Sequence, residues 1–359
     1  MAVLNDEQAM LRDMAREWAA NESPFTAWRA LRDSTLRDSE TGAGFDPDAW
    51  QAMAGMGWSG IMVPEEHGGS DFGWMSAGLV VEELGKVLAA SPIIGVTIAA
   101  WAIAQGEDED AKARHLPTLA SGDTIAALAV DERPRHAPGK IGAKVEDGKL
   151  TGTKSFVADA AEAGIFVVAA GDGLWLVEKG EGVSVAGRVL ADRRSHGEVV
   201  FDAAPATRLG DAAMAEQMLD RARILTACEM LGMAQHLFDT TLDYLKQRVQ
   251  FNQVLATFQA LQHRMADLFA EIASMRAAVE GGLEALDSGR RVPQAACIAK
   301  ARANDVLNLM SREAIQLHGG IGMTDEYPVG DYLKRARVLE NRWGSSAFLR
   351  DRFAGLAGY

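Results

Sequence analysis

The stretch Arg248-Val-Gln-Phe-Asn-Gln-Val-Leu-Ala-Thr-Phe-Gln259 joins two long segments with helical periodicity, and Gln316-Leu-His-Gly-Gly-Ile-Gly-Met-Thr-Asp-Glu-Tyr-Pro328 closes a third. An arginine at a helix end, followed by a short loop, offers planar bidentate donors and free backbone groups to a phosphate. The pair Gly319-Gly320 lets a helix end approach a ligand closely because it lacks Cβ atoms. Each stretch alone also fits a surface arginine or a plain glycine helix cap. Their occurrence together favours a ligand-binding role.

The segments around these two stretches predict a helical bundle. Residues 212–247, 259–288 and 294–318 carry helical patterns of bundle length. Residues 1 to about 120 also read as helical, with Asn5 as one N-cap and Asp46-Pro47 as the start of another helix.

Between these helical regions the period changes to that of short strands. Runs of apolar and β-branched residues recur about every ten residues up to about Asp202, and turn formers separate them. The pair Asp147-Gly148 is the strongest hairpin signal in the chain. We therefore predict an α+β fold with an N-terminal helical domain (residues 1–120), a middle antiparallel β domain (121–208) and a C-terminal four-helix bundle (209–359).

Composition excludes several classes of function. The chain has 359 residues and a formal net charge of −14, which argues against a nucleic-acid surface. Its two cysteines, Cys228 and Cys297, fit neither a disulfide scaffold nor a zinc motif, and no metal site is expected. The most apolar stretch, Ile93 to Ala104, is too short to span a bilayer, and the N-terminus lacks the apolar region of a signal peptide. We expect a cytoplasmic protein that binds neither membranes nor nucleic acid.

The two quoted stretches resemble the acyl-CoA dehydrogenase family. The family pattern R-x-x-F followed by F-Q matches Arg248, Phe251, Phe258 and Gln259, and the pattern Q-x-x-G-G matches Gln316, Gly319 and Gly320. The loop from Pro64 to Gly69 and the helix–sheet–helix order also agree with the family. The resemblance implies FAD as cofactor and α,β-dehydrogenation of an acyl-CoA thioester. It also implies that these residues, together with Gln250, hold the pyrophosphate and adenosine half of the FAD of a neighbouring subunit.

By the same resemblance, this chain lacks the carboxylate base that removes the α-proton in the family. Most family members carry a glutamate before a glycine where this chain has Trp343, and a minority carry the base where this chain has Ala222, before Arg223. A tryptophan side chain only donates hydrogen bonds, so it cannot accept the α-proton. No catalytic residue is therefore assigned. Three acids could be substitutes, namely Glu340, Glu229 and Asp220. The ordinary roles are a helix-pairing acid for Glu229, and either solvent exposure or pairing with Arg337 for Glu340.

The part of the site that would face the flavin ring also departs from the family pattern. The family has a loop rich in glycine and serine where this chain has Val130-Asp-Glu-Arg-Pro-Arg-His-Ala-Pro-Gly139. Phe156 and Ala158 stand where the family has a tryptophan and a threonine, and Ala158 has no hydroxyl to offer flavin N5.

These departures lead to a hypothesis of a divided enzyme. The chain would be the non-catalytic subunit of a heteromeric, α2β2 acyl-CoA dehydrogenase, and its partner would be a second subunit of the same kind that carries the catalytic glutamate. The resemblance implies an acyl-CoA substrate, such as a steroid side-chain thioester, and an electron-transfer flavoprotein as acceptor. Two alternatives remain open. One is a homo-oligomeric dehydrogenase that uses a displaced acid such as Glu340, and the other is a flavin-free scaffold or acyl-CoA-binding protein.

Overall fold

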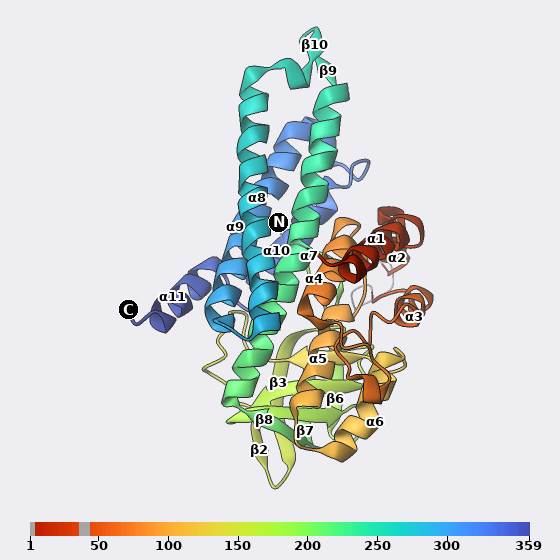
Figure 1. Ribbon diagram of the computed structural model, residues 1–359, viewed down its shortest axis with the longest axis vertical. Helices are drawn as coiled ribbons and strands as arrows, with labels where there is room; N and C mark the ends of the chain where they lie inside the picture. Colours follow the sequence, from red (N-terminus) through yellow and green to blue (C-terminus); the bar gives the residue numbers. More distant parts are fainter. Residues whose placement is uncertain (1–3, 36–43) are drawn as a thin grey trace. The chain divides into compact units, whose positions relative to one another are not determined.

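The computed structural model describes residues 4–35 and 44–359, and helices, strands and helices follow one another along the chain (Figure 1). This order confirms the predicted α+β fold, with a helical N-terminal part, middle β-sheets and a C-terminal helical bundle. By compactness the chain forms two units. The first contains the described residues up to Phe25 with Gly78–Ala89 and Arg223–Tyr359, and the second contains Thr26–Ala77 and Ala90–Ala222. The domain limits at residues 120 and 208 stay predictions.

The N-terminal helices begin at the capping residues that the sequence indicates. The Asn5 side chain accepts a hydrogen bond from the Gln8 N–H at 2.8 Å, and the Gln8 side chain accepts one from the Asn5 N–H at 3.1 Å. Asp46 caps the next predicted helix and accepts a hydrogen bond from the Asp48 N–H at 2.9 Å. The helices are α1 (Asp6–Asn21), α2 (Phe25–Thr35), α3 (Pro47–Gly55), α4 (Gly73–Lys86), α5 (Ile93–Gln105) and α6 (Glu109–Ala120), with the single turn η1 (Glu65–His67) between α3 and α4.

The second unit contains two four-stranded sheets, in the orders β1-β4-β5-β8 and β2-β3-β7-β6. The Asp147-Gly148 hairpin is confirmed, because both residues have positive φ (50° and 72°) and Glu146 pairs with Lys149. One pair, β1 with β4, is parallel. The regular strand spacing did not reveal this pair, since the chain passes through β2 and β3 of the other sheet before it returns. The strands are β1 (Ala126–Ala129), β2 (Lys144–Glu146), β3 (Lys149–Ala158), β4 (Ile165–Ala170), β5 (Gly173–Glu178), β6 (Val183–Val189), β7 (Ser195–Pro205) and β8 (Thr207–Asp211).

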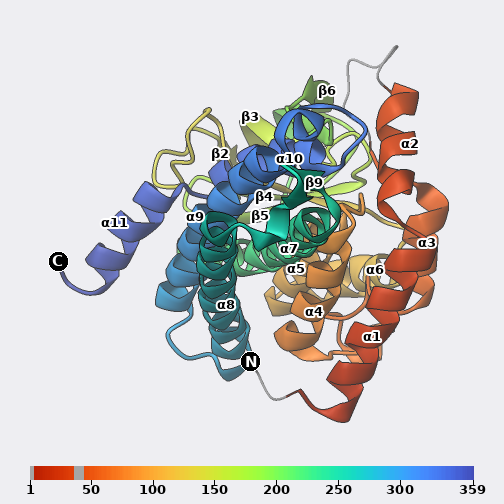
Figure 2. The ribbon, with the colours of Figure 1, turned by 90° about the horizontal axis from the view of Figure 1, so that it is seen from above.

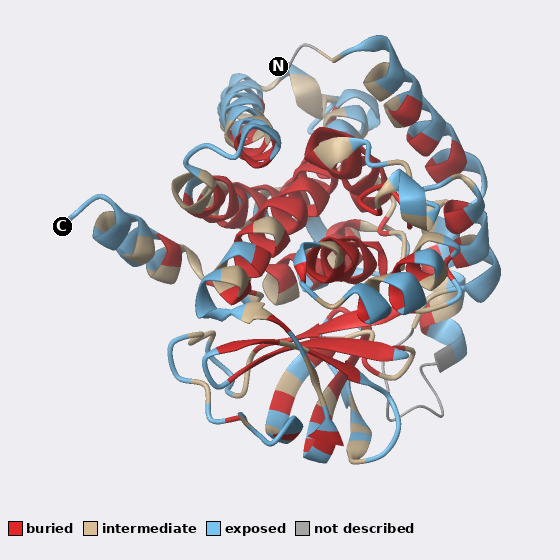
Figure 3. Ribbon diagram, turned by 60° about the horizontal axis from the view of Figure 1, so that its bottom comes forward, coloured by how far each residue is buried: buried red, intermediate tan, exposed pale blue. Residues whose placement is uncertain are grey.

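The core of this unit lies between the two sheets and under helix α5. Phe166 and Phe201 meet edge to face in the inter-sheet core, with ring centroids 5.9 Å apart. Every residue of α5 from Ile93 to Ile103 is buried, and Gly95 lies so close to the Ala126 carbonyl that a Cβ would be 2.7 Å from it. Figure 3 shows the buried strands as a continuous layer. The apolar run is therefore a core helix. In the described ranges, no helix combines the length and hydropathy needed to cross a bilayer.

The bundle of the first unit contains the long helices that the sequence predicts. Helices α7 (Ala212–Gln247) and α8 (Gln259–Ser288) have the predicted limits, and α9 (Val292–His318) begins two residues earlier than predicted. Helix α10 (Val329–Asn341) runs beside α9, and α11 (Ser346–Leu356) packs on α9 through Leu349 (Figure 2). The helices approach closely at Gly282 of α8, whose missing Cβ would lie 3.3 Å from both Ile224 and Ala299. The bundle thus fixes the C-terminal ends of α7 and α9, from which the two motif segments emerge.

Candidate functional site

The segment that begins at Arg248 forms a short hairpin at one end of the bundle (Figure 1). Strands β9 (Val249–Gln250) and β10 (Gln253–Val254) pair across a turn formed by Phe251 and Asn252, which both have positive φ (53° and 63°). The turn projects the Phe251 ring outward, where it is 83% exposed and meets Phe258 edge to face with centroids 6.2 Å apart. The side chains of Arg248, Gln250 and Gln259 are exposed as well.

The second segment leaves the C-terminal end of α9. After His318, the turn η3 (Gly319–Met323) begins with Gly319 at φ 66°, a conformation that glycine adopts without strain. A Cβ added to Gly319 or Gly320 would meet no heavy atom within 4 Å, so both backbones face open space. Gln316 is exposed on the last turn of α9. This segment therefore presents uncovered backbone, which suits close approach to a ligand.

Tyr244 joins the two segments and was not identified from the sequence. It lies one helical turn before Arg248, whose N–H donates to the Tyr244 carbonyl at 2.8 Å. Its hydroxyl donates to the His318 carbonyl at 3.2 Å, and the Tyr244 and His318 rings stack with centroids 4.4 Å apart. The predicted residues Arg248 and Gly319 therefore emerge from the same end of the bundle.

One of the two positions at which the sequence lacks a base, Trp343, is held by the arginine that follows the other position in the chain. Arg223, which directly follows Ala222 in α7, is fully buried, and its Nε donates to the Trp343 carbonyl at 3.0 Å. Trp343 is 4% exposed and has a φ of 56°, an unusual conformation for a bulky residue. The Arg342 guanidinium carbon lies 4.0 Å from the Trp343 ring centroid. The side chains at the two positions are a methyl group (Ala222) and an indole (Trp343), and neither can remove a proton.

Two buried polar residues of α9 hold the same segment. Lys300 is fully buried, and its Nζ donates to the Leu339 carbonyl at 2.9 Å and to Asn304 Oδ1 at 2.5 Å. Asn304 Nδ2 donates to the Gly344 carbonyl at 3.2 Å. Burial, and secondarily the charge of Arg223, lowers the pKa of Lys300 to about 7. Sequence reasoning missed this pair, although a lysine and an asparagine at i,i+4 spacing on an apolar helix face are a usable signal.

Two of the three substitute acids, Glu340 and Glu229, have the ordinary roles expected of them. Glu340 accepts hydrogen bonds from Arg337 Nη1 at 2.8 Å and from Asn308 Nδ2 at 3.0 Å. The carboxylate of Glu229 is bidentate with Arg335 of the neighbouring helix, at 2.8 and 3.1 Å. Asp220 is 1% exposed and lies in the second unit. Both glutamates are therefore paired with arginine side chains. Either carboxylate would have to break these charge-assisted hydrogen bonds before it could accept a proton.

In the second unit, ion pairs close the loop that replaces the family's glycine-rich segment. Glu132 accepts hydrogen bonds from the N–H groups of Gly142 (2.7 Å) and Ala143 (3.0 Å) and from the buried Lys154 Nζ at 2.8 Å. Burial alone would raise the pKa of Glu132, but these hydrogen bonds outweigh it and hold the pKa below its usual value. Two residues beyond Lys154, Phe156 is 41% exposed at a φ of 58°. The loop is therefore held by hydrogen bonds between the Glu132 carboxylate, the Lys154 ammonium and backbone N–H groups.

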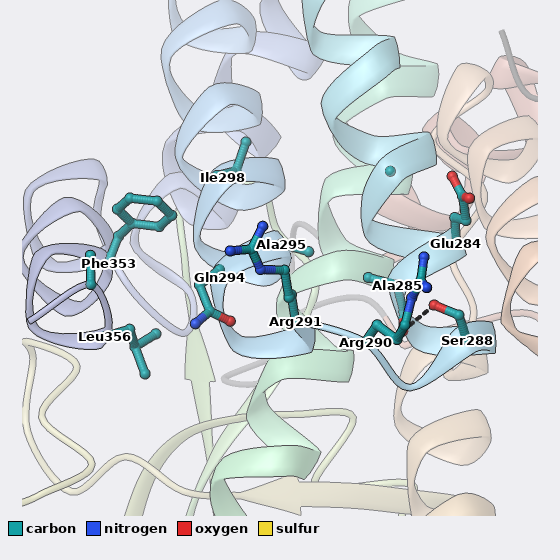
Figure 4. Close-up of a pocket in the computed structure, with 12 residues that line it drawn as sticks. Glu284, Ala285, Ser288, Arg290, Arg291, Gln294, Ala295, Ile298, Phe353 and Leu356 are labelled. Carbon is teal, nitrogen blue, oxygen red and sulfur yellow. Dashed lines mark hydrogen bonds between the residues drawn. The ribbon is translucent and has the colours of Figure 1, made fainter.

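A hollow of about 880 Å³ lies at the other end of the bundle (Figure 4). Helix α8 has 30 residues, about 45 Å at 1.5 Å per residue, and separates the hollow from the β9–β10 hairpin. None of the predicted cofactor residues lines it. The lining residues come from α8, α9, α11 and the turn between α8 and α9: Gly281, Glu284, Ala285, Ser288, Arg290, Arg291, Gln294, Ala295, Ile298, Phe353, Leu356 and Ala357.

Comparison with known proteins agrees with the geometry. Residues 5–123 match the model of the acyl-CoA dehydrogenase N-terminal domain, and residues 211–355 match that of the C-terminal domain. The acyl-CoA dehydrogenase IpdE2 of Mycolicibacterium smegmatis is 30% identical over 334 residues, which cover 93% of each chain. The chain belongs to the acyl-CoA dehydrogenase family, whose members act on acyl-CoA and bind FAD.

Two solved structures share the fold. A variant of the Tcur3481-Tcur3483 steroid ACAD is 29% identical, with a TM-score of 0.90 and 98% coverage of both chains. The ChsE4-ChsE5 complex from Mycobacterium tuberculosis has the same TM-score of 0.90 at 22% identity, covering 100% of both chains, a likeness that shows the fold alone.

The buried Lys300 predicts a measurable dependence of stability on pH. Its pKa in the folded chain is about 7 against an ordinary 10.5, so between these values the unfolded chain binds one more proton. The free energy of unfolding should therefore rise with pH by up to about 1.4 kcal/mol per unit from this group. Urea unfolding of Lys300→Met at pH 7, 8 and 9 should lack this rise. The free energy of unfolding of the wild type, relative to that of the variant, should therefore increase from pH 7 to pH 9. Parallel pH profiles for the two proteins would contradict the buried, weakly basic lysine.

Proposed function

We propose that this member of the acyl-CoA dehydrogenase family is the non-catalytic subunit of a heteromeric, α2β2 acyl-CoA dehydrogenase. It would donate FAD-binding residues to a catalytic partner subunit and perform no proton abstraction itself. The observation that carries the proposal is the pairing of Arg223 with the Trp343 carbonyl at 3.0 Å. Arg223 directly follows Ala222, which stands at one position where the family places its base, and Trp343 stands at the other; neither side chain can accept a proton.

The reaction needs a carboxylate close to the acyl α-carbon. FAD, when bound, accepts the hydride that leaves the β-carbon as a base removes the α-proton. In this chain Trp343 fills the first family position with a donor-only indole. Arg223 donates to the Trp343 carbonyl, and Asn304 donates to the carbonyl of the next residue, Gly344. Glu340, on the preceding helix α10, would first have to leave Arg337. The chain's own residues thus provide no free base for the reaction at this position.

The exposed motif residues are suited to a cofactor held by another subunit. The Arg248 guanidinium would bind the pyrophosphate through paired N–H donors, and the exposed Phe251 ring offers a flat apolar surface to the adenosine part. The open backbone of Gly319 and Gly320 allows close contact without a Cβ in the way. The remaining contributors are Gln250, Phe258, Gln259 and Gln316. This half of the site fits the nucleotide portion of FAD.

The ring half of a site in this chain itself fits FAD poorly. Ala158 has no hydroxyl, and the loop from Val130 to Gly139 is held by the Glu132–Lys154 pair where the family uses small residues. A related structure of 29% identity is described as a steroid ACAD under two protein names, which supports a heteromer and a bulky steroid-type acyl-CoA thioester. An electron-transfer flavoprotein would accept the electrons, and we place the complex in the cytoplasm.

The donation of Arg248 is tested by substitution in the purified complex. Arg248→Ala should weaken FAD retention by about tenfold or more, because a charge-assisted hydrogen bond to the pyrophosphate is worth about 1.5–3 kcal/mol. Flavin released during dialysis or gel filtration measures the effect. Lys246→Ala removes an exposed cation only two residues away and should leave retention unchanged. Equal FAD retention in Arg248→Ala and in the wild type would refute the donor role.

The absence of a displaced base is tested at Glu340. Glu340→Gln keeps the size of the side chain and removes its basicity, so turnover of the complex should stay within about twofold of the wild type. Removal of an essential general base would instead lower turnover by about 10²-fold or more. A loss of that size, with FAD content unchanged, would favour the homo-oligomeric enzyme that uses Glu340.

A further inference from the structure

An aromatic cluster of Tyr244, His318 and Tyr327 adjoins the chain segments that carry the proposed nucleotide-binding residues. His318 stacks on Tyr244 at 4.4 Å and lies 4.8 Å from the Tyr327 ring, and Tyr244 meets Tyr327 edge to face at 5.5 Å. The three rings come from the last turn of α7, the last residue of α9 and the loop before α10. The cluster therefore ties together three chain segments that would otherwise end separately.

The contacts of His318 fix the form of its ring. Nδ1 lies 2.8 Å from the Ala314 carbonyl, a pure acceptor, so Nδ1 carries the proton and Nε2 holds a lone pair. His318 is 3% exposed, and its Nε2 has no hydrogen-bond partner among the residues that the structure describes. Burial lowers the pKa of His318, which keeps the ring neutral. A buried acceptor without a donor costs about 1–3 kcal/mol, so an ordinary apolar residue would be the more stable filler here.

The backbone around the cluster leads to both motif segments. The carbonyl of His318 is among the last of α9, which have no partner within the helix, and the Tyr244 hydroxyl satisfies it at 3.2 Å. The next residue is Gly319. On the other side, the Tyr244 carbonyl accepts the Arg248 N–H at 2.8 Å, which fixes the start of the hairpin. Tyr244 thus contacts both segments, the start of the hairpin through its backbone carbonyl and the residue before Gly319 through its side-chain hydroxyl.

We propose that Tyr244 and His318 are positioning residues that hold Arg248 and the Gly319–Gly320 backbone in one fixed arrangement for the FAD of the partner subunit. The proposal rests on the proposed function, because it assigns a role within the same donated site. Helix ends fray, and both motif segments lie at exposed helix ends. Ordering them before the ligand binds lowers the entropy lost on binding, so the cluster increases affinity without touching the ligand.

The test is a double-mutant cycle in the purified complex with its partner, with two measurements on each variant. The first is the dissociation constant of FAD, from flavin fluorescence during reconstitution of the apo complex. The second is the melting temperature of the apo complex. Tyr244→Leu removes the stacking and the hydroxyl, Tyr244→Phe removes only the hydroxyl, and Tyr359→Leu changes a tyrosine that is 98% exposed.

We expect Tyr244→Leu to weaken FAD binding by about tenfold and Tyr244→Phe by about threefold, while Tyr359→Leu has no effect. The melting temperature of the apo complex should change by no more than about 2–4 °C. Combining Tyr244→Leu with Arg248→Ala should weaken binding less than the product of the single effects, because the cluster acts through Arg248.

Contradictory results separate the two proposals. If Arg248→Ala weakens FAD binding but Tyr244→Leu leaves it within twofold, the positioning role is wrong and the donor role stands. Strictly multiplicative effects, together with a large fall in the melting temperature of Tyr244→Leu, would show a purely structural cluster. If Arg248→Ala has no effect on FAD binding, both proposals fail.

Discussion

The buried Arg223 side chain is the constraint on which the interpretation of this chain depends. A fully buried guanidinium that donates to the Trp343 carbonyl fixes the turn between α10 and α11, and the Lys300–Asn304 pair secures the same turn from α9. These donors bind backbone carbonyls, so they hold the turn through its backbone and not through the side chain of residue 343. The turn in which we expect the base of the family is therefore held by backbone hydrogen bonds and carries Trp343. The groups that hold the backbone of an active site differ from the side chain that reacts. A fold can therefore keep the former without the latter.

The opposite holds at the far end of the bundle. There the side chains and backbones that we propose for nucleotide binding face outward, with Phe251 83% exposed and Gly319 open to solvent. The large aromatic ring of Phe251 stands out in a positive-φ turn, where it leaves apolar surface in contact with water. This exposure is understandable when a second subunit and its cofactor cover the ring. The cluster of Tyr244 and His318 gives this end the order that its surface position would otherwise lack.

Much of the fold follows from local patterns, and the least predictable parts depend on distant contacts. The limits of α7 and α8, the Asn5 and Asp46 caps and the Asp147-Gly148 turn follow from periodicity and short-range hydrogen bonding. The parallel pairing of β1 with β4 does not, since it depends on a crossover through another sheet. Motif residues such as Arg248 and Gly319 were found by their spacing. Tyr244, Lys300 and Glu132 were missed because their roles come from partners between 10 and 74 positions away, including Gly142, Leu339 and His318.

The central claim is that this chain supplies residues to a cofactor site centred in another subunit. Its most direct measurement is the number of FAD molecules per complex, by native mass spectrometry of the complex purified with its partner. One FAD for each pair of unlike chains, with none retained by this chain alone, is the predicted result. One FAD per chain, with dehydrogenation by this chain alone, would contradict it.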